Sequence, residues 1–245
     1  MLARTLCFTV AFVSACASST PQAKRRPPPE VNDQTEIQPA QVVRDAESGL
    51  ATAPWVVAKA DITASGAVAA DVDVTVTMMR GNRLRFAVTG TFADKPLALC
   101  YVSNGEQIRN GDASGAPTPA ELNEAVVIGW VRMGLLHNVA MLSGGRGPDR
   151  ADGGVAEWVR TSGERWAPPR VSPAANEQIV EFDLEVSGQP VGRVSLNTDA
   201  TTGLPNGRVQ VVRFPEGEMR VSESYRFARD AAPTEADFVL TGECP

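Results

Sequence analysis

Residues 118–142 read TPAELNEAVVIGWVRMGLLHNVAML, and this stretch decides the fold. Thr118, Pro119 and Glu121 form a capping-box pattern with proline at the first helical position, which predicts one helix from here to about Leu142. Apolar side chains cover most of the circumference of this helix: Leu122, Ala125, Val126, Trp130, Met133, Leu136, Val139 and Ala140. Such a wide apolar arc cannot be buried against one flat surface. We therefore expect apolar partners on several sides of the helix.

Polar residues inside the same stretch argue against a membrane span. The helix is about long enough to cross a bilayer, but it contains Glu124, Arg132, His137 and Asn138, and such side chains are rare in spans. His137 is the only histidine of the chain. We interpret it as a satisfied or partly exposed core histidine rather than a catalytic one.

Alternating sequences on both sides of the helix predict strands. Residues 71–78 alternate strictly, and after a turn at residues 80–83 a second alternating run covers residues 84–92. Residues 97–103 form a third run, which ends in the hairpin signal Asn104-Gly105. The inward-facing side chains of the first two runs are apolar: Val72, Val74, Val76, Met78, Leu84, Phe86, Val88 and Phe92. These runs predict an antiparallel meander with one wet face.

Strands resume after the helix. In residues 180–186 the apolar Val180, Phe182, Leu184 and Val186 alternate with acidic residues, and further strands are expected at 191–197, at 208–214 and around Tyr225. A short helix is expected at residues 39–49. Because every connection is short enough for a hairpin, we expect an α+β fold, in which a single curved antiparallel sheet forms an incomplete β-barrel wrapped around the mostly apolar helix.

The N-terminus carries a targeting signal. Arg4 precedes a short apolar run at residues 6–13, and Val13-Ser14-Ala15-Cys16 resembles the lipobox of bacterial lipoproteins. The resemblance implies a signal peptide at residues 1–15 and attachment of acyl groups such as palmitate to Cys16. An ordinary secretory signal with a coincidental cysteine is the alternative. The resemblance also favours the outer membrane, facing the periplasm, because Ala17 rather than an aspartate follows the cysteine.

A tether separates the expected anchor from the folded part. Residues 16–39 are rich in proline and polar residues, with Lys24-Arg25-Arg26 at their centre, and such a tract is expected to stay disordered. We therefore place the domain boundaries at 1–15 for the signal peptide, 16–39 for the lipidated cysteine and its tether, and 40–245 for the barrel domain. Membrane lipid is the first expected partner, through the acyl anchor.

Three short motifs resemble the LolA/LolB lipoprotein-carrier family. They are GNRLRF at residues 81–86, YVSNGE at 101–106 and LNTDATTGLP at 196–205. The resemblance covers about residues 40–230 and implies an incomplete antiparallel barrel lidded by helices. Residues 143–178 depart from the family pattern, being longer and richer in glycine and proline. Trp158 and Trp166 in this segment are expected either to form a lid or partner-facing patch, or to cover the edge of the core.

Two cysteines remain once Cys7 and Cys16 are set aside. Cys100 lies in an apolar strand pattern and Cys244 is the last residue but one of the sequence. The expected compartment permits disulfides, so we predict a Cys100–Cys244 bridge. Two unrelated buried thiols are the alternative.

The charge of the chain and its lack of catalytic motifs narrow the function. Lys and Arg number 23 against 29 Asp and Glu, a net charge of −6, which argues against nucleic acid as a partner. No nucleophile elbow or phosphate loop is present, a calcium turn at residues 149–154 lacks its bidentate glutamate, and Glu181, Asp183 and Glu185 are expected on a solvated face. We therefore expect no enzyme activity, no metal site and no cofactor.

Two functions remain open. The first is a lipid-anchored carrier or receptor that binds a lipid or an acylated lipoprotein in an apolar barrel cavity. Its expected lining is Val74, Val76, Met78, Leu84, Phe86, Val88, Trp130, Met133, Leu136, Phe182 and Leu184. The second is an interaction or assembly lipoprotein with a filled barrel, whose envelope protein partner binds the loop at residues 143–178.

Overall fold

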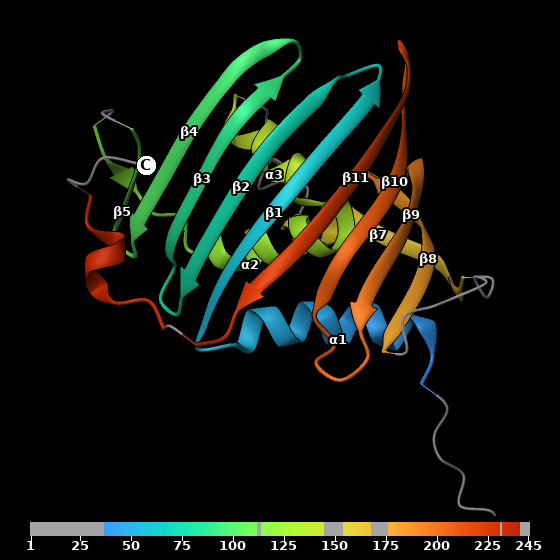
Figure 1. Ribbon diagram of the computed structural model, residues 1–245, viewed down its shortest axis with the longest axis horizontal. Coiled ribbons are helices and arrows are strands. Elements are labelled where there is room, and N and C mark those ends of the chain that lie inside the picture. Colours follow the sequence, from blue (N-terminus) through green and yellow to red (C-terminus); the bar gives the residue numbers. More distant parts are fainter. Residues whose placement is uncertain (1–36, 112–113, 145–153, 168–175, 231, 241–245) are drawn as a thin grey trace, which may run out of the picture. The chain divides into compact units, whose positions relative to one another are not determined.

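One antiparallel sheet dominates the part of the chain that the computed structural model describes, residues 37–111, 114–144, 154–167, 176–230 and 232–240. In these residues eleven strands follow one another in the order β6-β5-β4-β3-β2-β1-β11-β10-β9-β8-β7 (Figure 1). The first and last long strands, β1 and β11, are paired, whereas the two edge strands β6 and β7 are not paired with each other. The sheet is therefore an open barrel rather than a closed one.

The bounds of the elements follow the chain. The strands are β1 (Trp55–Gly66), β2 (Ala70–Met79), β3 (Arg83–Phe92), β4 (Lys95–Asn104), β5 (Gln107–Asn110), β6 (Ala116–Pro117), β7 (Val159–Trp166), β8 (Glu177–Val186), β9 (Gln189–Asp199), β10 (Pro205–Phe214) and β11 (Gly217–Ala228). The helices are α1 (Pro39–Thr52), α2 (Leu122–Ile128), the π-helix η1 (Gly129–Met133), α3 (Leu135–Leu142), α4 (Val155–Trp158) and the 3-10 helix η3 (Glu235–Phe238).

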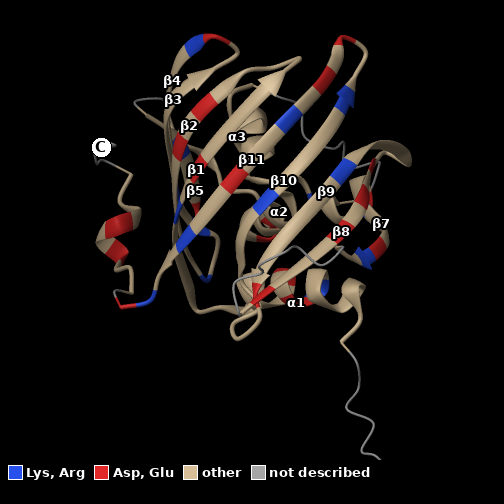
Figure 2. Ribbon diagram, turned by 45° about the vertical axis from the view of Figure 1, so that its right-hand side comes forward, with Lys and Arg blue, Asp and Glu red and all other residues tan. Residues whose placement is uncertain are grey.

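The sheet surrounds the central helices, as the apolar arc predicts. Figures 1 and 2 show α2 and α3 inside the curve of the sheet, with α1 across one end of it. Trp130 of η1 is 0% exposed. Its ring stacks on Phe227 at 5.5 Å and meets Tyr225 edge-on at 5.4 Å, both from β11. The predicted α+β class with an incomplete barrel is confirmed.

The inward faces of β2 and β3 match the alternation of the sequence. Direct cross-strand partners such as Val74 and Val88, or Val76 and Phe86, point to the same side of the sheet and are buried in one core. The short helix expected at residues 39–49 is also present as α1, which buries Val42, Val43, Ala46 and Leu50. These elements are set by local pattern alone.

The prediction of one continuous helix capped by Thr118 is wrong. Helix α2 begins only at Leu122, and the Thr118 hydroxyl instead lies 2.8 Å from the Ser103 hydroxyl. The helical stretch then divides into α2, η1 and α3, and the break between the last two falls at Gly134, whose φ is 91°. The cause of this break lies in the sheet, as described below.

The expectation of a loop at residues 143–178 is also corrected. Within it, α4 and β7 are regular, and β7 pairs with β8 as an edge strand. Trp158 packs against the core, whereas Trp166 is 40% exposed. Residues 145–153, which include most of the stretch at 149–154 rejected as a calcium turn, and residues 168–175 lie outside the described residues.

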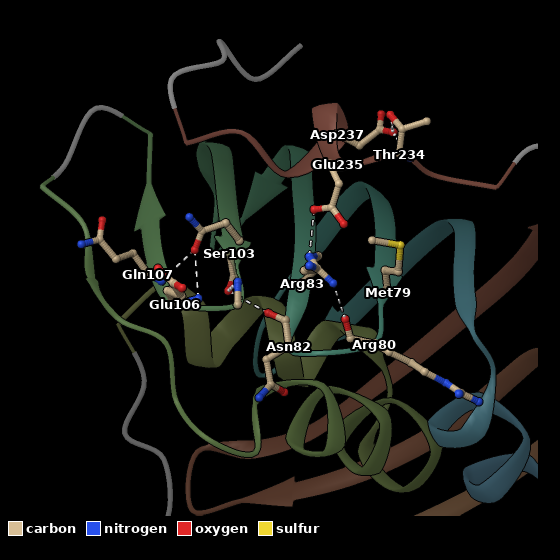
Figure 3. Close-up of polar contacts among 12 residues, drawn as sticks. Met79, Arg80, Asn82, Arg83, Ser103, Glu106, Gln107, Thr234, Glu235 and Asp237 are labelled. Atoms are coloured by element: carbon tan, nitrogen blue, oxygen red, sulfur yellow. Dashed lines mark hydrogen bonds and ion pairs between the residues drawn. The ribbon is translucent and has the colours of Figure 1, made fainter.

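A C-terminal segment packs on the outer face of the sheet. Arg83 of β3 forms an ion pair with Glu235 at 3.0 Å and donates to the carbonyl of Arg80 (Figure 3). Phe238 of η3, 1% exposed, is buried beside β3 and β4. Cys100 is paired with Ala87 and points to this same outer face, yet it is only 5% exposed.

Several predictions fall on residues outside the described ranges. Cys16, the signal peptide, most of the tether and Cys244 are among them, so lipidation, the N-terminal domain boundaries and the disulfide stay predictions. Among the helices that the structure describes, none is both long and apolar enough to cross a membrane.

Candidate functional site

An apolar cavity of about 390 Å³ is lined by residues at the hairpin ends of the sheet. Figure 1 shows these hairpins at the end of the sheet opposite α1. The cavity walls come from the helices and from the strand ends that meet at four hairpins. The helical contribution is Met133, Leu136, His137 and Ala140, and the strand contribution is Val68, Phe92, Leu184, Val186, Val191, Gln210, Val212, Arg213, Phe214 and Met219. Most of this lining is aliphatic or aromatic, which suits an apolar ligand.

The expected lining residues divide into three groups. Met133, Leu136 and Leu184 line this cavity, and Met78 lines a different hollow beside α1. The others are packed in the core around the helices and line neither hollow: Val74, Val76, Leu84, Phe86, Val88, Trp130 and Phe182. The helices thus fill the middle of the barrel and leave the cavity at one end of it.

Four polar side chains lie on the inward face of β10 and β11, and we call Arg208, Gln210, Glu223 and Tyr225 the polar belt. All four are buried. Arg208 and Glu223 are direct cross-strand partners. Buried charges are costly unless hydrogen bonds satisfy them, so their partners matter.

Arg208 binds the C-terminal end of η1. Its Nη1 donates to the carbonyl oxygens of Trp130 at 2.9 Å and Val131 at 3.1 Å. Its Nη2 donates to the carbonyl of Arg132 at 2.9 Å and to Gln210 Oε1 at 2.7 Å. The last carbonyls of a helix have no partner within the helix and carry partial negative charge, so a guanidinium satisfies them well.

Glu223 binds the beginning of the next helix. Its carboxylate accepts the backbone N–H groups of Leu135 at 2.8 Å and Leu136 at 3.1 Å, and also the hydroxyl of Tyr225. The first N–H groups of a helix likewise lack internal partners and favour negative charge. The two belt charges therefore stabilise the helix ends on both sides of Gly134.

Gly134 makes the approach of the belt possible. A Cβ at this position would lie 2.4 Å from Glu223 Oε1, and its φ of 91° is rarely adopted by other residues. The sequence pattern offered no caps at this point, because the capping groups lie in strands far along the chain. The break is therefore a tertiary feature.

Burial shifts the titration of two groups near the cavity. Burial, and after it the positive charge of Arg208, lowers the pKa of His137 from 6.5 to about 4. Burial, and after it the Glu223 carboxylate, raises the pKa of Tyr225 well above its usual value. At neutral pH the cavity wall therefore presents a neutral imidazole, whose ring lies 5.7 Å from that of Trp158.

A second hollow of about 510 Å³ lies between α1 and α2. Leu50, Val56 and Val127 supply apolar wall, but charged groups also line it. Arg132 Nε and Nη2 donate to the two carboxylate oxygens of Glu47 at 2.6 and 2.9 Å, and this bonding raises the pKa of Arg132. This hollow is less apolar than the first and is a poorer match for a lipid chain.

The outer face of the sheet carries ordinary surface chemistry. Glu181 forms an ion pair with Arg165 at 3.0 Å, and Asp183 with Arg193 at 3.1 Å, on the face of β8 opposite its buried apolar side chains. Both signs of charge are interspersed over this face (Figure 2). Within the described residues no group of three or more His, Cys, Asp or Glu could hold a metal ion.

Sequence reasoning missed the polar belt. For Glu223 a signal exists, because it continues the inward series Met219, Val221, Tyr225 at the one position that is charged. For Arg208 there is none, since Val209 and Val211 on the other face alternate equally well. Which face of β10 turns inward is decided by its pairing with β9 and β11.

Comparison with known proteins gives only distant likenesses. A scan of protein-family models finds no match, and no curated protein matches by sequence. Among solved structures, MucB is similar with 14% identity and a TM-score of 0.37, covering 84% of this chain and 63% of MucB. The Mycobacterium tuberculosis lipoprotein LppX is similar with 12% identity and a TM-score of 0.38, covering 76% of this chain and 93% of LppX.

A LolA superfamily protein from Nitrosomonas europaea is also similar, with 9% identity and a TM-score of 0.34, covering 83% of this chain and 98% of that protein. At these TM-scores none of the three structures assigns a family or a function to this chain.

Proposed function

We propose that this chain is an envelope lipoprotein that binds a lipid or an acylated ligand in its apolar cavity, as a carrier or receptor. The observation that carries the proposal is the cavity itself: about 390 Å³, lined mostly by aliphatic and aromatic side chains, with Gln210, Arg213 and a neutral His137 as its polar groups. A ligand in such a site gains affinity chiefly from the burial of apolar surface. Acyl chains have that chemistry.

Binding can be tested on residues 16–245 carrying Cys16→Ser, made without acyl groups. Native mass spectrometry should find co-purified lipid, and a fluorescent fatty-acid probe should bind and be displaced by lipid. Val212→Phe, which points into the cavity, should weaken probe binding by about tenfold or more, since an aromatic ring would occupy ligand space.

Val211→Phe is the matched control for this experiment. It makes the same change one residue away, on the opposite face of β10, and should leave probe binding unchanged. Absence of any bound lipid, together with no uptake of the probe by the unsubstituted chain, would remove the carrier and receptor proposal.

The anchor is proposed to be Cys16, followed by the tether. Labelling of growing cells with an alkyne-tagged fatty acid should mark the wild-type protein and leave the Cys16→Ala protein unlabelled. Equal labelling of both proteins would rule out the lipobox interpretation.

The disulfide between Cys100 and Cys244 is proposed on the position of the C-terminal segment. Glu235 and Phe238 lie on the outer face of β3 and β4, where Cys100 is buried, and Cys244 follows Phe238 closely in the sequence. Thiol titration of the denatured, unreduced protein should find neither cysteine free.

Protein docking at the β7 edge is the second candidate function. It is favoured by the 40% exposure of Trp166 on an edge strand of the sheet. Aromatic side chains are enriched at interfaces, and edge strands can accept an added strand. Trp166→Ala should abolish cross-linking to an envelope protein while leaving probe binding unchanged if this function is correct.

No catalytic role is proposed, because the buried charges Arg208 and Glu223 serve the helix ends.

A further inference from the structure

We infer that the cavity accepts one acyl chain, and that its ligand is a monoacyl lipid such as a free fatty acid or a lysophospholipid. The inference rests on the proposed function and narrows it, because it excludes ligands that must bury two or three chains together. Three features of the cavity carry it: its volume, its floor and its mouth.

The volume fits a single chain. A methylene group takes up about as much space as a water molecule, whose share of liquid volume is roughly 30 Å³. The cavity of about 390 Å³ therefore holds roughly 13 such groups. Two chains of that length would need about twice the volume, and three chains about three times.

The polar belt forms the floor and prevents a longer chain from entering the core. Along β10, the inward-facing Phe214, Val212 and Gln210 line the cavity in turn, and the next inward residue, Arg208, does not. At this end of the cavity, Gln210 Oε1 accepts a hydrogen bond from Arg208. Arg208 also donates to backbone carbonyls of η1. An acyl chain that displaced these bonds would leave buried polar groups unpaired, at a cost that further methylene burial does not recover.

The core directly beyond the belt is filled by Trp130 and its neighbours. Trp130 and Val131 are 0% exposed, and the aromatic rings of Tyr225 and Phe227 close around the indole. Expansion in this direction would require Trp130 to leave its stacked position. The available length is therefore fixed by the belt rather than by a yielding apolar wall.

The mouth leaves room for a polar head group in water. Phe214 at the rim is 40% exposed, and the side chain of Arg213 beside it is 75% exposed. Arg213 pairs with Glu218 at 3.3 Å, but such an exposed pair contributes little and exchanges readily. A carboxylate or phosphate at the mouth can take the place of Glu218 on the guanidinium.

The test measures affinity against chain length. For residues 16–245 with Cys16→Ser, freed of lipid, saturated fatty acids of about 8 to about 18 carbons displace the fluorescent probe. The affinity should rise about threefold to fourfold per added CH₂ while the chain is being buried, and should level off near roughly 13 carbons. Native mass spectrometry should show one fatty acid per protein. A diacyl phospholipid should bind no more than about threefold tighter than its lysophospholipid, since its second chain stays in water.

Variants place the limit in the cavity. Ala140→Phe narrows the wall formed by α3 and should move the levelling point to chains about three carbons shorter, with unchanged melting temperature as the check on folding. Val211→Phe should leave the levelling point where it is. Arg213→Gln distinguishes the two monoacyl ligands, fatty acid and lysophospholipid. The ligand whose head group contacts the Arg213 guanidinium should bind this variant more weakly than the unsubstituted chain.

Other outcomes overturn the inference. They are a continued rise in affinity to the longest chain, two fatty acids bound per protein, or a diacyl or triacylated lipid that binds more than tenfold tighter than its monoacyl counterpart. In each of these cases lipid binding, and so the proposed function, stands. If no lipid of any class binds, the proposed function itself fails and the inference fails with it.

Discussion

The inward faces of β2–β3 and of β10–β11 contact the same central helices but solve different problems. On β2 and β3 the inward side chains are all apolar, from Val72 to Val88, and they fill space against the helices. On β10 and β11 the apolar series is interrupted by Arg208 and Glu223, which bind helix ends, and by Gln210, which accepts a hydrogen bond from Arg208. The first face can be exchanged for any apolar surface of similar volume, whereas the second is specific for one broken helix.

Loss of the belt cation should have the largest effect. Arg208→Met removes the guanidinium donors from three helix carbonyls and leaves the buried Glu223 without a nearby positive charge, so the free energy of unfolding should fall by about 3–5 kcal/mol. Denaturant unfolding measures it. Arg193→Met, an exposed arginine of β9, is the control and should cost about 0–1 kcal/mol. Equal losses of unfolding free energy in the two variants would show that Arg208 stabilises the fold no more than an exposed arginine does.

Truncation on the apolar face should cost somewhat less, and the face should tolerate repacking. Leu84→Ala removes a fully buried side chain and should cost about 2–5 kcal/mol, while Leu84→Met keeps the volume and should cost less than about 1.5 kcal/mol. The corresponding conservative change in the belt, Arg208→Lys, should not be tolerated so well, because lysine lacks the fork of donors. Denaturant unfolding of all three variants compares the faces directly.

Acid should lower the free energy of unfolding through protonation of His137. The pKa of His137 is lowered from 6.5 to about 4, so the unfolded chain binds the proton more tightly than the folded one. The stability contribution is complete above pH 6.5 and is lost as the pH falls toward 4, by about 3 kcal/mol in all.

His137→Gln isolates this contribution. Asp61, Asp199 and Asp237 also have lowered pKa values, so every variant loses some stability in acid. The unsubstituted chain should nevertheless lose about 3 kcal/mol more than His137→Gln between pH 7 and pH 4. Parallel pH profiles of unfolding would contradict the assignment.

The smallest expected effect contrasts two glycines. Gly134→Ala meets Glu223 Oε1 and an unfavourable φ, and should cost about 1–3 kcal/mol. Gly49→Ala, inside α1 with nothing within 4 Å of its Cβ, should stabilise by about 0.5–1 kcal/mol. The melting temperature should therefore fall in Gly134→Ala and rise in Gly49→Ala. A melting temperature that also rises in Gly134→Ala would show that the belt does not require glycine at this position.

Most of the sheet could be predicted from the sequence, but only part of the site could. The alternation at residues 71–78 and the hairpin signal at Asn104-Gly105 report on neighbours in the chain, and both strands follow. The pattern predicts Met133, Leu136 and Leu184 as part of a ligand-cavity lining, and these three lie in the wall of the apolar cavity. The pattern does not single out Val212 and Met219, because the cavity depends on where four hairpins end relative to the helices.

The break at Gly134 shows the limit most clearly. The local sequence around it favours one helix, and the carboxylate that caps α3 lies 88 residues beyond Leu135. A pattern read along the chain contains no information on that contact.

The class of the fold follows from local sequence, because the strand periodicity and the unusually wide apolar arc of the helix leave few ways to bury the apolar side chains. The sequence also determined the expectation of a lipid anchor, through a local motif. Tertiary structure alone decided which polar residues turn inward, where the helix breaks and where the apolar space remains. Those features depend on hydrogen bonds and packing between segments far apart in the chain, which exist only once the sheet has curved around the helices.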